Sequence, residues 1–180
     1  MHPTQSFRDR MVHLGRGDPA QSGGGVFDLL IHDVDFCQHL FGIPEAVSAT
    51  GYVDAPRGID FILAQFHYPN IGPVFVTGGW HHPKAYPFSM EYTVMGDGGT
   101  VEFNSALRPP TLYSQDGKEA AIVVPQEDGY QAEMEYFLEC IQKGSKPEKC
   151  PPAESAAAVK LARLMLESRA RNGEKLTCRI

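Results

Sequence analysis

The 180-residue chain has 16 basic and 22 acidic side chains, which gives a formal net charge of -6 at pH 7. Phosphate binding needs clustered Lys and Arg, and no basic run occurs, so the charge argues against a nucleic-acid-binding protein. The composition, 42% apolar and 21% charged, is that of a globular protein with a core. No stretch approaches the ~20 apolar residues that span a bilayer, and the polar N-terminus has no apolar signal segment. We therefore expect a cytoplasmic protein with neither membrane nor nucleic-acid partners.

The first 21 residues follow neither helical nor strand periodicity. We expect an arm or loop over residues 1–21 and a single domain over residues 22–180. The cysteines show no metal-binding spacing and lie within apolar patterns, which predicts buried free thiols in a reducing compartment. They are Cys37, Cys140, Cys150 and Cys178.

The first predicted element is a helix. Its periodicity runs from Val26 to Phe41, and Gly42 supplies a C-terminal cap. Gly23-Gly24-Gly25 precedes it. Such a run could receive an anion at the helix N-terminus, although it more often permits a tight turn and close packing.

Seven strand-like segments follow, rich in β-branched and aromatic residues. Glycine-containing turns at residues 96–99 and 116–117 predict hairpins between some of them. The segments are 46–53, 59–68, 74–80, 90–95, 100–103, 111–114 and 120–124.

Two further helices and a short strand complete the chain. Asp128 is placed to cap the second helix, which ends at Gly144, and Pro151-Pro152 begins the third, which runs to about Arg171. Residues 175–180 could form a last strand. The second helix has an apolar face made of Tyr130, Met134, Phe137, Leu138 and Ile141.

Strands and helices are segregated along the chain and do not alternate. This order predicts an α+β fold, with an open, mainly antiparallel sheet and helices packed on one of its faces. It argues against a doubly wound parallel sheet, in which strands and helices alternate.

The first helix carries an unusual polar stripe. Asp28, His32, Asp35 and His39 fall within an arc about 60° wide on an α-helix, and nearly all other positions are apolar, so we expect burial around most of the circumference. The Asp28 carboxylate could bond one nitrogen of His32, which would fix the tautomer and leave the other nitrogen as a general base. A solvated edge is the alternative for this pair, and it is the favoured interpretation of Asp35 and His39.

Metal binding and sugar binding are further possibilities. Asp28, His32, Asp33 and Asp35 are suitable metal ligands, but Asp33 points to another face and no further ligand has a fitting spacing, so we predict no metal site. Trp80 and His82 should share one strand face, opposite His81. An aromatic ring with a nearby His can line a sugar pocket, while a Trp on a sheet surface is more often a packing or oligomer contact.

Residues 22–35, SGGGVFDLLIHDVD, closely resemble the signature of the Gfo/Idh/MocA family of glucose–fructose oxidoreductases and inositol dehydrogenases. The signature is a glycine run followed by Asp28, then His32 four residues later and Asp35 three beyond. The hairpin at 91–101 is also similar to the family, and the likeness covers about residues 22–180.

The resemblance implies a dihydrodipicolinate-reductase-like C-terminal domain that forms a homo-oligomer through its open sheet face. It implies NAD(P)-dependent oxidation of a sugar or polyol, with His32 exchanging the proton of the substrate hydroxyl and Asp28 binding substrate and orienting His32. Trp80 and His82 remain candidate substrate-binding residues.

NAD or NADP would be held by a separate Rossmann domain. This chain has no glycine loop that follows a strand and opens a helix, so we assign it no cofactor-binding residue and expect it to be inactive alone. The alternative is a non-enzymatic ligand-binding or oligomerisation module that retains the fold.

Overall fold

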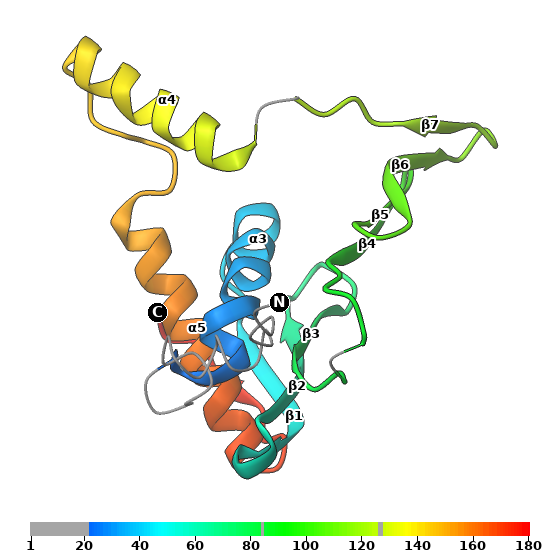
Figure 1. The fold of residues 1–180 in the computed structure, drawn as a ribbon, viewed down its shortest axis with the longest axis vertical. Helices are drawn as coiled ribbons and strands as arrows, with labels where there is room; N and C mark the ends of the chain where they lie inside the picture. Colours follow the sequence, from blue (N-terminus) through cyan, green and yellow to red (C-terminus); the bar gives the residue numbers. More distant parts are fainter. Residues whose placement is uncertain (1–21, 84, 126–127) are drawn as a thin grey trace, which may run out of the picture. The chain divides into compact units, whose positions relative to one another are not determined.

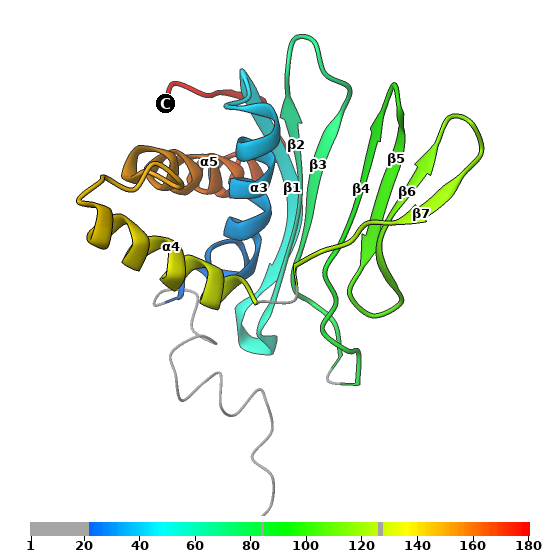
Figure 2. The same ribbon diagram turned by 90° about the horizontal axis from the view of Figure 1, so that it is seen from above.

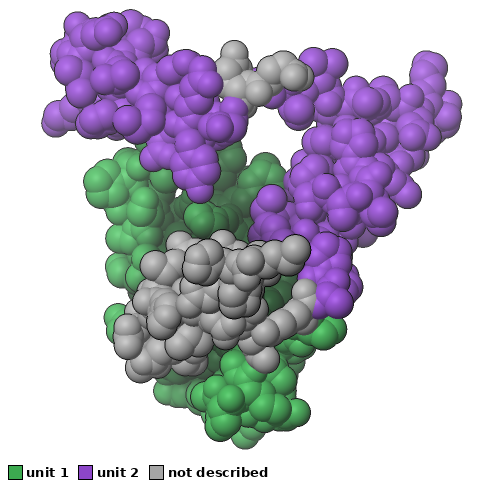
Figure 3. Space-filling view, viewed as in Figure 1, with its two compact units in different colours: residues 1–83, 148–180 green, residues 84–147 purple. Residues whose placement is uncertain are grey.

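The computed structural model describes residues 22–83, 85–125 and 128–180. Its helices and strands follow the predicted order (Figure 1). The chain divides into two compact units, Met1–Pro83 with Glu148–Ile180, and Lys84–Pro147 (Figure 3). The elements are η1 (Val26–Leu30), α3 (Ile31–Phe41), β1 (Ala46–Asp54), η2 (Ala55–Arg57), β2 (Ile59–His67), β3 (Val74–Trp80), β4 (Glu91–Gly96), β5 (Gly99–Asn104), β6 (Arg108–Ser114), β7 (Glu119–Ala121), α4 (Gly129–Lys143), α5 (Pro152–Ala170) and β8 (Leu176–Thr177).

The first unit is a four-stranded antiparallel sheet in the order β3-β2-β1-β8. The helices η1, α3 and α5 cover one face of this sheet (Figure 2). Strand β2 shows why, because alternate residues from Asp60 to Phe66 are buried beneath the helices while Leu63 on the other face is exposed. The predicted α+β class and antiparallel pairing are confirmed.

The core of the first unit lies between the sheet and the helices. Small residues on α5 let its backbone approach the sheet closely, and Ser168 near its end is fully buried. The Ser168 hydroxyl accepts a hydrogen bond from the Ala49 N–H (2.7 Å) and donates one to the Glu174 carbonyl (2.6 Å). The principal core residues are Val26, Leu30, Val34, Val47, Ala49, Ile62, Ala64, Phe66, Val76, Ala158, Leu161, Ala162 and Met165.

The second unit contains an antiparallel sheet in the order β4-β5-β6-β7, together with α4. Gly96 pairs with Gly99 across the first predicted hairpin. Asp128 caps α4 as predicted, its carboxylate accepting from the Gln131 N–H at 2.8 Å. The apolar face predicted for this helix is exposed, from 50% at Phe137 to 82% at Tyr130.

Three expectations are corrected. The first helix is not α-helical throughout, because it contains a π-helix at Val26–Leu30 and is α-helical from Ile31 onward. It is not buried around most of its circumference, because it meets the sheet and α5 on one side and leaves Phe36 and Leu40 exposed. Cys150 is an exposed thiol beside the start of α5. Every helix in the part of the chain that the structure describes is too short or too polar to cross a bilayer.

Candidate functional site

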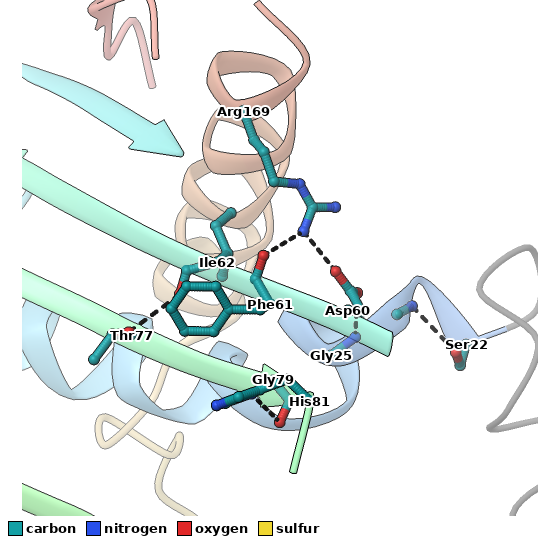
Figure 4. Close-up of polar contacts among 10 residues, drawn as sticks. Ser22, Gly25, Asp60, Phe61, Ile62, Thr77, Gly79, His81 and Arg169 are labelled. Carbon is teal, nitrogen blue, oxygen red and sulfur yellow. Dashed lines mark hydrogen bonds and ion pairs between the residues drawn. The ribbon is translucent and has the colours of Figure 1, made fainter. Parts of the chain in front are cut away.

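The glycine run before η1 forms a buried, tightly turned helix start. Gly23 and Gly24 have φ values of +76° and +75°, which favour glycine. The Gly24 N–H donates to the Ser22 hydroxyl (3.1 Å), and the Gly25 N–H donates to Oδ2 of Asp60 (2.7 Å) (Figure 4). Polar groups of the chain itself therefore already accept from the two donors that an anion would use, so the tight-turn interpretation is the better one.

Close packing also requires these glycines. A Cβ atom on Gly24 would lie 2.2 Å from Oδ2 of Asp60, and one on Gly25 would lie 2.9 Å from the Cα of Gly79. Neither position has room for a side chain. The start of η1 thus lies directly against the beginning of β2 and the end of β3.

Asp60 connects this helix start to α5. It is only 7% exposed, and its Oδ1 atom forms an ion pair with Nη1 of Arg169 at 2.5 Å. The same Arg169 nitrogen donates to the Phe61 carbonyl at 3.2 Å. One buried carboxylate therefore binds the last turn of α5 with one oxygen and the first turn of η1 with the other (Figure 4).

Asp28 and His32 lie on successive turns of the helix that starts at this carboxylate. Val26, Leu30 and Val34, spaced four apart, form its buried stripe, while Asp28 is half-buried and His32 exposed. The pair is also four apart and offset by two residues, so it lies roughly opposite that stripe. Residues four apart are neighbours on a helix surface, so Asp28 and His32 occupy adjacent positions on this face.

Asp35 and His39 continue the stripe along α3. Asp35 is half-buried and His39 is exposed. No three His, Cys, Asp or Glu side chains form a metal-holding group anywhere in residues 22–83, 85–125 and 128–180. The metal hypothesis therefore lacks a ligand set in that part of the chain.

The two aromatic candidates, Trp80 and His82, lie at the end of β3. Trp80 is half-buried and pairs in register with Asp60, so it is on the sheet face that carries η1. The predicted alternation does not reach His82, because the strand ends at Trp80. The rings of His81 and His82 lie 3.9 Å apart, and that of His81 is 4.7 Å from Phe61. The prediction that His81 and His82 face opposite ways is therefore wrong.

Burial lowers the pKa of His81, and the neighbouring His82 lowers it further. Nδ1 of His81 also lies 3.3 Å from the Gly79 carbonyl. The Gly79 contact opposes the effects of burial and of His82, and the net shift of the His81 pKa is downward.

The family model for the GFO/IDH/MocA C-terminal domain matches residues 4–102, more than half of the chain. The chain belongs to this family. Its glycine run, Asp28 and His32 all lie inside the match, and the family is one of oxidoreductases.

The Gfo/Idh/MocA domain is similar to known enzymes over most of its length. It is 26% identical over 159 residues to trans-1,2-dihydrobenzene-1,2-diol dehydrogenase of Bos taurus. The alignment covers 81% of this chain and 46% of the bovine enzyme. In fold it is similar to levoglucosan dehydrogenase in complex with NADH and levoglucosan (TM-score 0.74, 14% identity, 92% of this chain and 53% of that one).

It is similar in the same way to UDP-N-acetylglucosamine 3-dehydrogenase of Acidithiobacillus ferrooxidans (TM-score 0.72, 17% identity, 92% of this chain and 51% of that one). The Gfo/Idh/MocA domain thus spans about half the length of the relatives that it matches.

Proposed function

We propose that this domain binds a sugar or polyol and exchanges the hydroxyl proton during an NAD(P)-dependent dehydrogenation. The observation that carries the proposal is the Asp28–His32 pair. Asp28 is half-buried and His32 is exposed, on a helix whose start is hydrogen-bonded to the sheet, and the chain belongs to a family of oxidoreductases. The substrate class is supported by the names of the relatives, which act on a diol, an anhydrosugar and a nucleotide sugar.

In the proposed reaction a secondary alcohol loses its O–H proton to a ring nitrogen of neutral His32 while the carbinol C–H leaves as hydride, giving a carbonyl. Asp28, one turn earlier, binds the substrate and orients the imidazole, and its negative charge stabilises the imidazolium that forms. Trp80 and His82 would contribute contacts to the sugar ring.

The hydride acceptor would be NAD or NADP held by another domain. The glycine run is not such a site, because the N–H groups of Gly24 and Gly25 already donate to Ser22 and Asp60. The 180-residue chain should therefore bind a polyol but reduce neither NAD⁺ nor NADP⁺ by itself.

His32→Ala tests the proposal, with His39→Ala as its matched control. Both are exposed histidines of α3, two turns apart on one stripe. On the 180-residue chain, levoglucosan and myo-inositol titrations are followed by NMR of the histidine rings. In the wild type we expect the His32 ring signal to shift as ligand is added. Ligand affinity should fall in His32→Ala and stay unchanged in His39→Ala.

The proton-transfer role is measured in a dehydrogenase that contains this domain, by NAD(P)H absorbance. His32→Ala should lower kcat by about 10²–10⁴-fold, the usual contribution of a general base, and His39→Ala should not. Equal turnover in both variants would remove the mechanism. Ligand binding with no turnover in any form would favour the non-enzymatic module.

We also propose that the domain forms a homo-oligomer through the sheet face that the helices leave open. Tyr52, Leu63 and Phe75 lie on this face and are 51%, 40% and 56% exposed. Leu63 and Phe75 line a shallow hollow there together with Thr50. A second copy of the chain would remove this apolar area from water.

A further inference from the structure

We propose that Asp60 is a positioning residue for the proton-transfer pair: it fixes the helix start from which Asp28 and His32 project. This inference rests on the proposed function of His32, but its first two measurements need no substrate. The supporting contacts are the bond from the Gly25 N–H to Oδ2 of Asp60 and the ion pair from Oδ1 to Arg169.

The two oxygens of Asp60 have separate tasks. Oδ1 binds Arg169, whose side chain is 15% exposed, and so holds α5 to the sheet. Oδ2 accepts from Gly25, three residues before Asp28 and seven before His32. The first contact concerns the stability of the unit, while the second concerns where the helix begins.

The starting point matters because it determines which way the later side chains point. A slip of one residue at the start of an α-helix turns every following side chain by about 100°. The risk is greater here, since Val26–Leu30 is a π-helix, whose hydrogen-bond register is a rare alternative to the α form. Holding Gly25 therefore fixes the direction in which Asp28 and His32 project.

The carboxylate is also well placed to act as a rigid stop. Asp60 is the second residue of β2 and is paired on both sides, with Val53 of β1 and Trp80 of β3. Oδ2 would lie only 2.2 Å from a Cβ atom at Gly24, so the helix start cannot move toward the sheet without displacing it. The position of η1 is thus set by its contact with β2.

Asp60→Asn is the sharpest test because it keeps the size of the side chain. An amide has one acceptor oxygen and a donor NH₂ group, so it cannot offer separate acceptor oxygens to Gly25 and Arg169, which contact different oxygens of Asp60. Arg169→Lys keeps Asp60 and its bond to Gly25, and removes the guanidinium. Asp54→Asn is the control, since Asp54 at the end of β1 pairs with Arg57 of η2, whose side chain is exposed, so the same change of charge is made at a surface ion pair.

Three quantities are measured on the 180-residue chain: hydrogen exchange of the Gly25 amide, the ring signal of His32, and affinity for levoglucosan. In Asp60→Asn we expect Gly25 protection to fall about tenfold or more, as for loss of a hydrogen bond to a charged group, and the His32 signal to move. Levoglucosan affinity should fall with them. Arg169→Lys should lower the urea midpoint while leaving Gly25 and His32 unchanged.

A double variant provides the rescue and keeps the test valid if Asp60→Asn does not fold. Asp60→Asn with Arg169→Met removes the unpaired buried cation and leaves the amide oxygen free for Gly25. We expect Gly25 protection and the His32 signal to return toward wild type. The proposal is overturned if they do not, if Asp60→Asn behaves like Asp54→Asn, or if Arg169→Lys moves His32 as far as Asp60→Asn does.

The outcomes also separate this inference from the proposed function. Altered Gly25 and His32 signals with no levoglucosan or myo-inositol binding, even by the wild type, support the positioning and count against the function. Ligand binding that depends on His32 but is unaffected by Asp60→Asn supports the proposed function and counts against the positioning role of Asp60.

Discussion

Gly24→Ala should be among the most damaging single substitutions in the first unit. Gly24 is buried with φ +75°, and a Cβ atom there would lie 2.2 Å from Oδ2 of Asp60. Gly42 provides the matched control, because its φ is +74° and a Cβ atom would meet nothing within 4 Å. Comparing the two alanine variants therefore separates backbone strain from the steric effect on Asp60.

The magnitude follows from these two contributions. A non-glycine residue in such a conformation costs on the order of 1–3 kcal/mol, and this should be the whole effect of Gly42→Ala. Gly24→Ala also pushes the carboxylate away from Gly25 and Arg169, and breaking a buried ion pair costs about 3–5 kcal/mol. We expect Gly24→Ala to be destabilising by about 3 kcal/mol more than Gly42→Ala.

Urea unfolding followed by tryptophan fluorescence measures this difference. The chain has one Trp, and Trp80 lies in the first unit beside the glycine run, so the signal reports the relevant part of the molecule. The free energies of unfolding of the two variants are compared when their urea m-values are equal, since equal m-values indicate that unfolding exposes the same surface area in both. Equal losses in the two variants would refute the reasoning, since they would mean that Asp60 yields without cost.

Two further predictions concern α5 and the open sheet face. Ser168→Ala leaves the buried N–H of Ala49 without its acceptor and should lower the free energy of unfolding in urea by about 1–3 kcal/mol. Ser155→Ala, on the exposed side of the same helix, should have little effect, and equal effects of the two variants would contradict the role of the Ser168 bonds. Phe75→Asp places a charge on the proposed oligomer face and should shift the mass measured by light scattering to that of the monomer. Leu40→Asp on α3 should leave the mass unchanged, and an oligomer that survives Phe75→Asp would rule out this face.

Local patterns were enough to predict most of the secondary structure. Periodicity and turn residues placed β1, β2 and β3 within a residue or two of their ends, and the Asp128 cap and Gly144 gave the limits of α4. These signals are local because turn and cap hydrogen bonds join residues close in sequence, and the alternation of a strand is read from consecutive residues. The family signature likewise lies within fourteen consecutive residues, 22–35.

The π turn and the true burial of the first helix could not be predicted in this way. Helical periodicity at about 100° per residue assumes one geometry throughout, and the π segment breaks that assumption at Val26–Leu30. Phe36 and Leu40 are apolar, which suggested burial, but the sheet and α5 contact only one side of the helix. Apolar side chains outnumber the positions that the core can cover, so composition alone overestimates burial.

The Asp60–Arg169 pair was missed because its partners are 109 residues apart and neither belongs to a motif. The glycine run nonetheless gave an indirect indication of this buried carboxylate. Consecutive glycines that must adopt positive φ and lack room for a Cβ atom imply that something fixed approaches the backbone, and a buried carboxylate is one group that an N–H donor can meet there. The glycines therefore leave room for Asp60 to bind the helix start, and by our proposal this start sets the direction of Asp28 and His32.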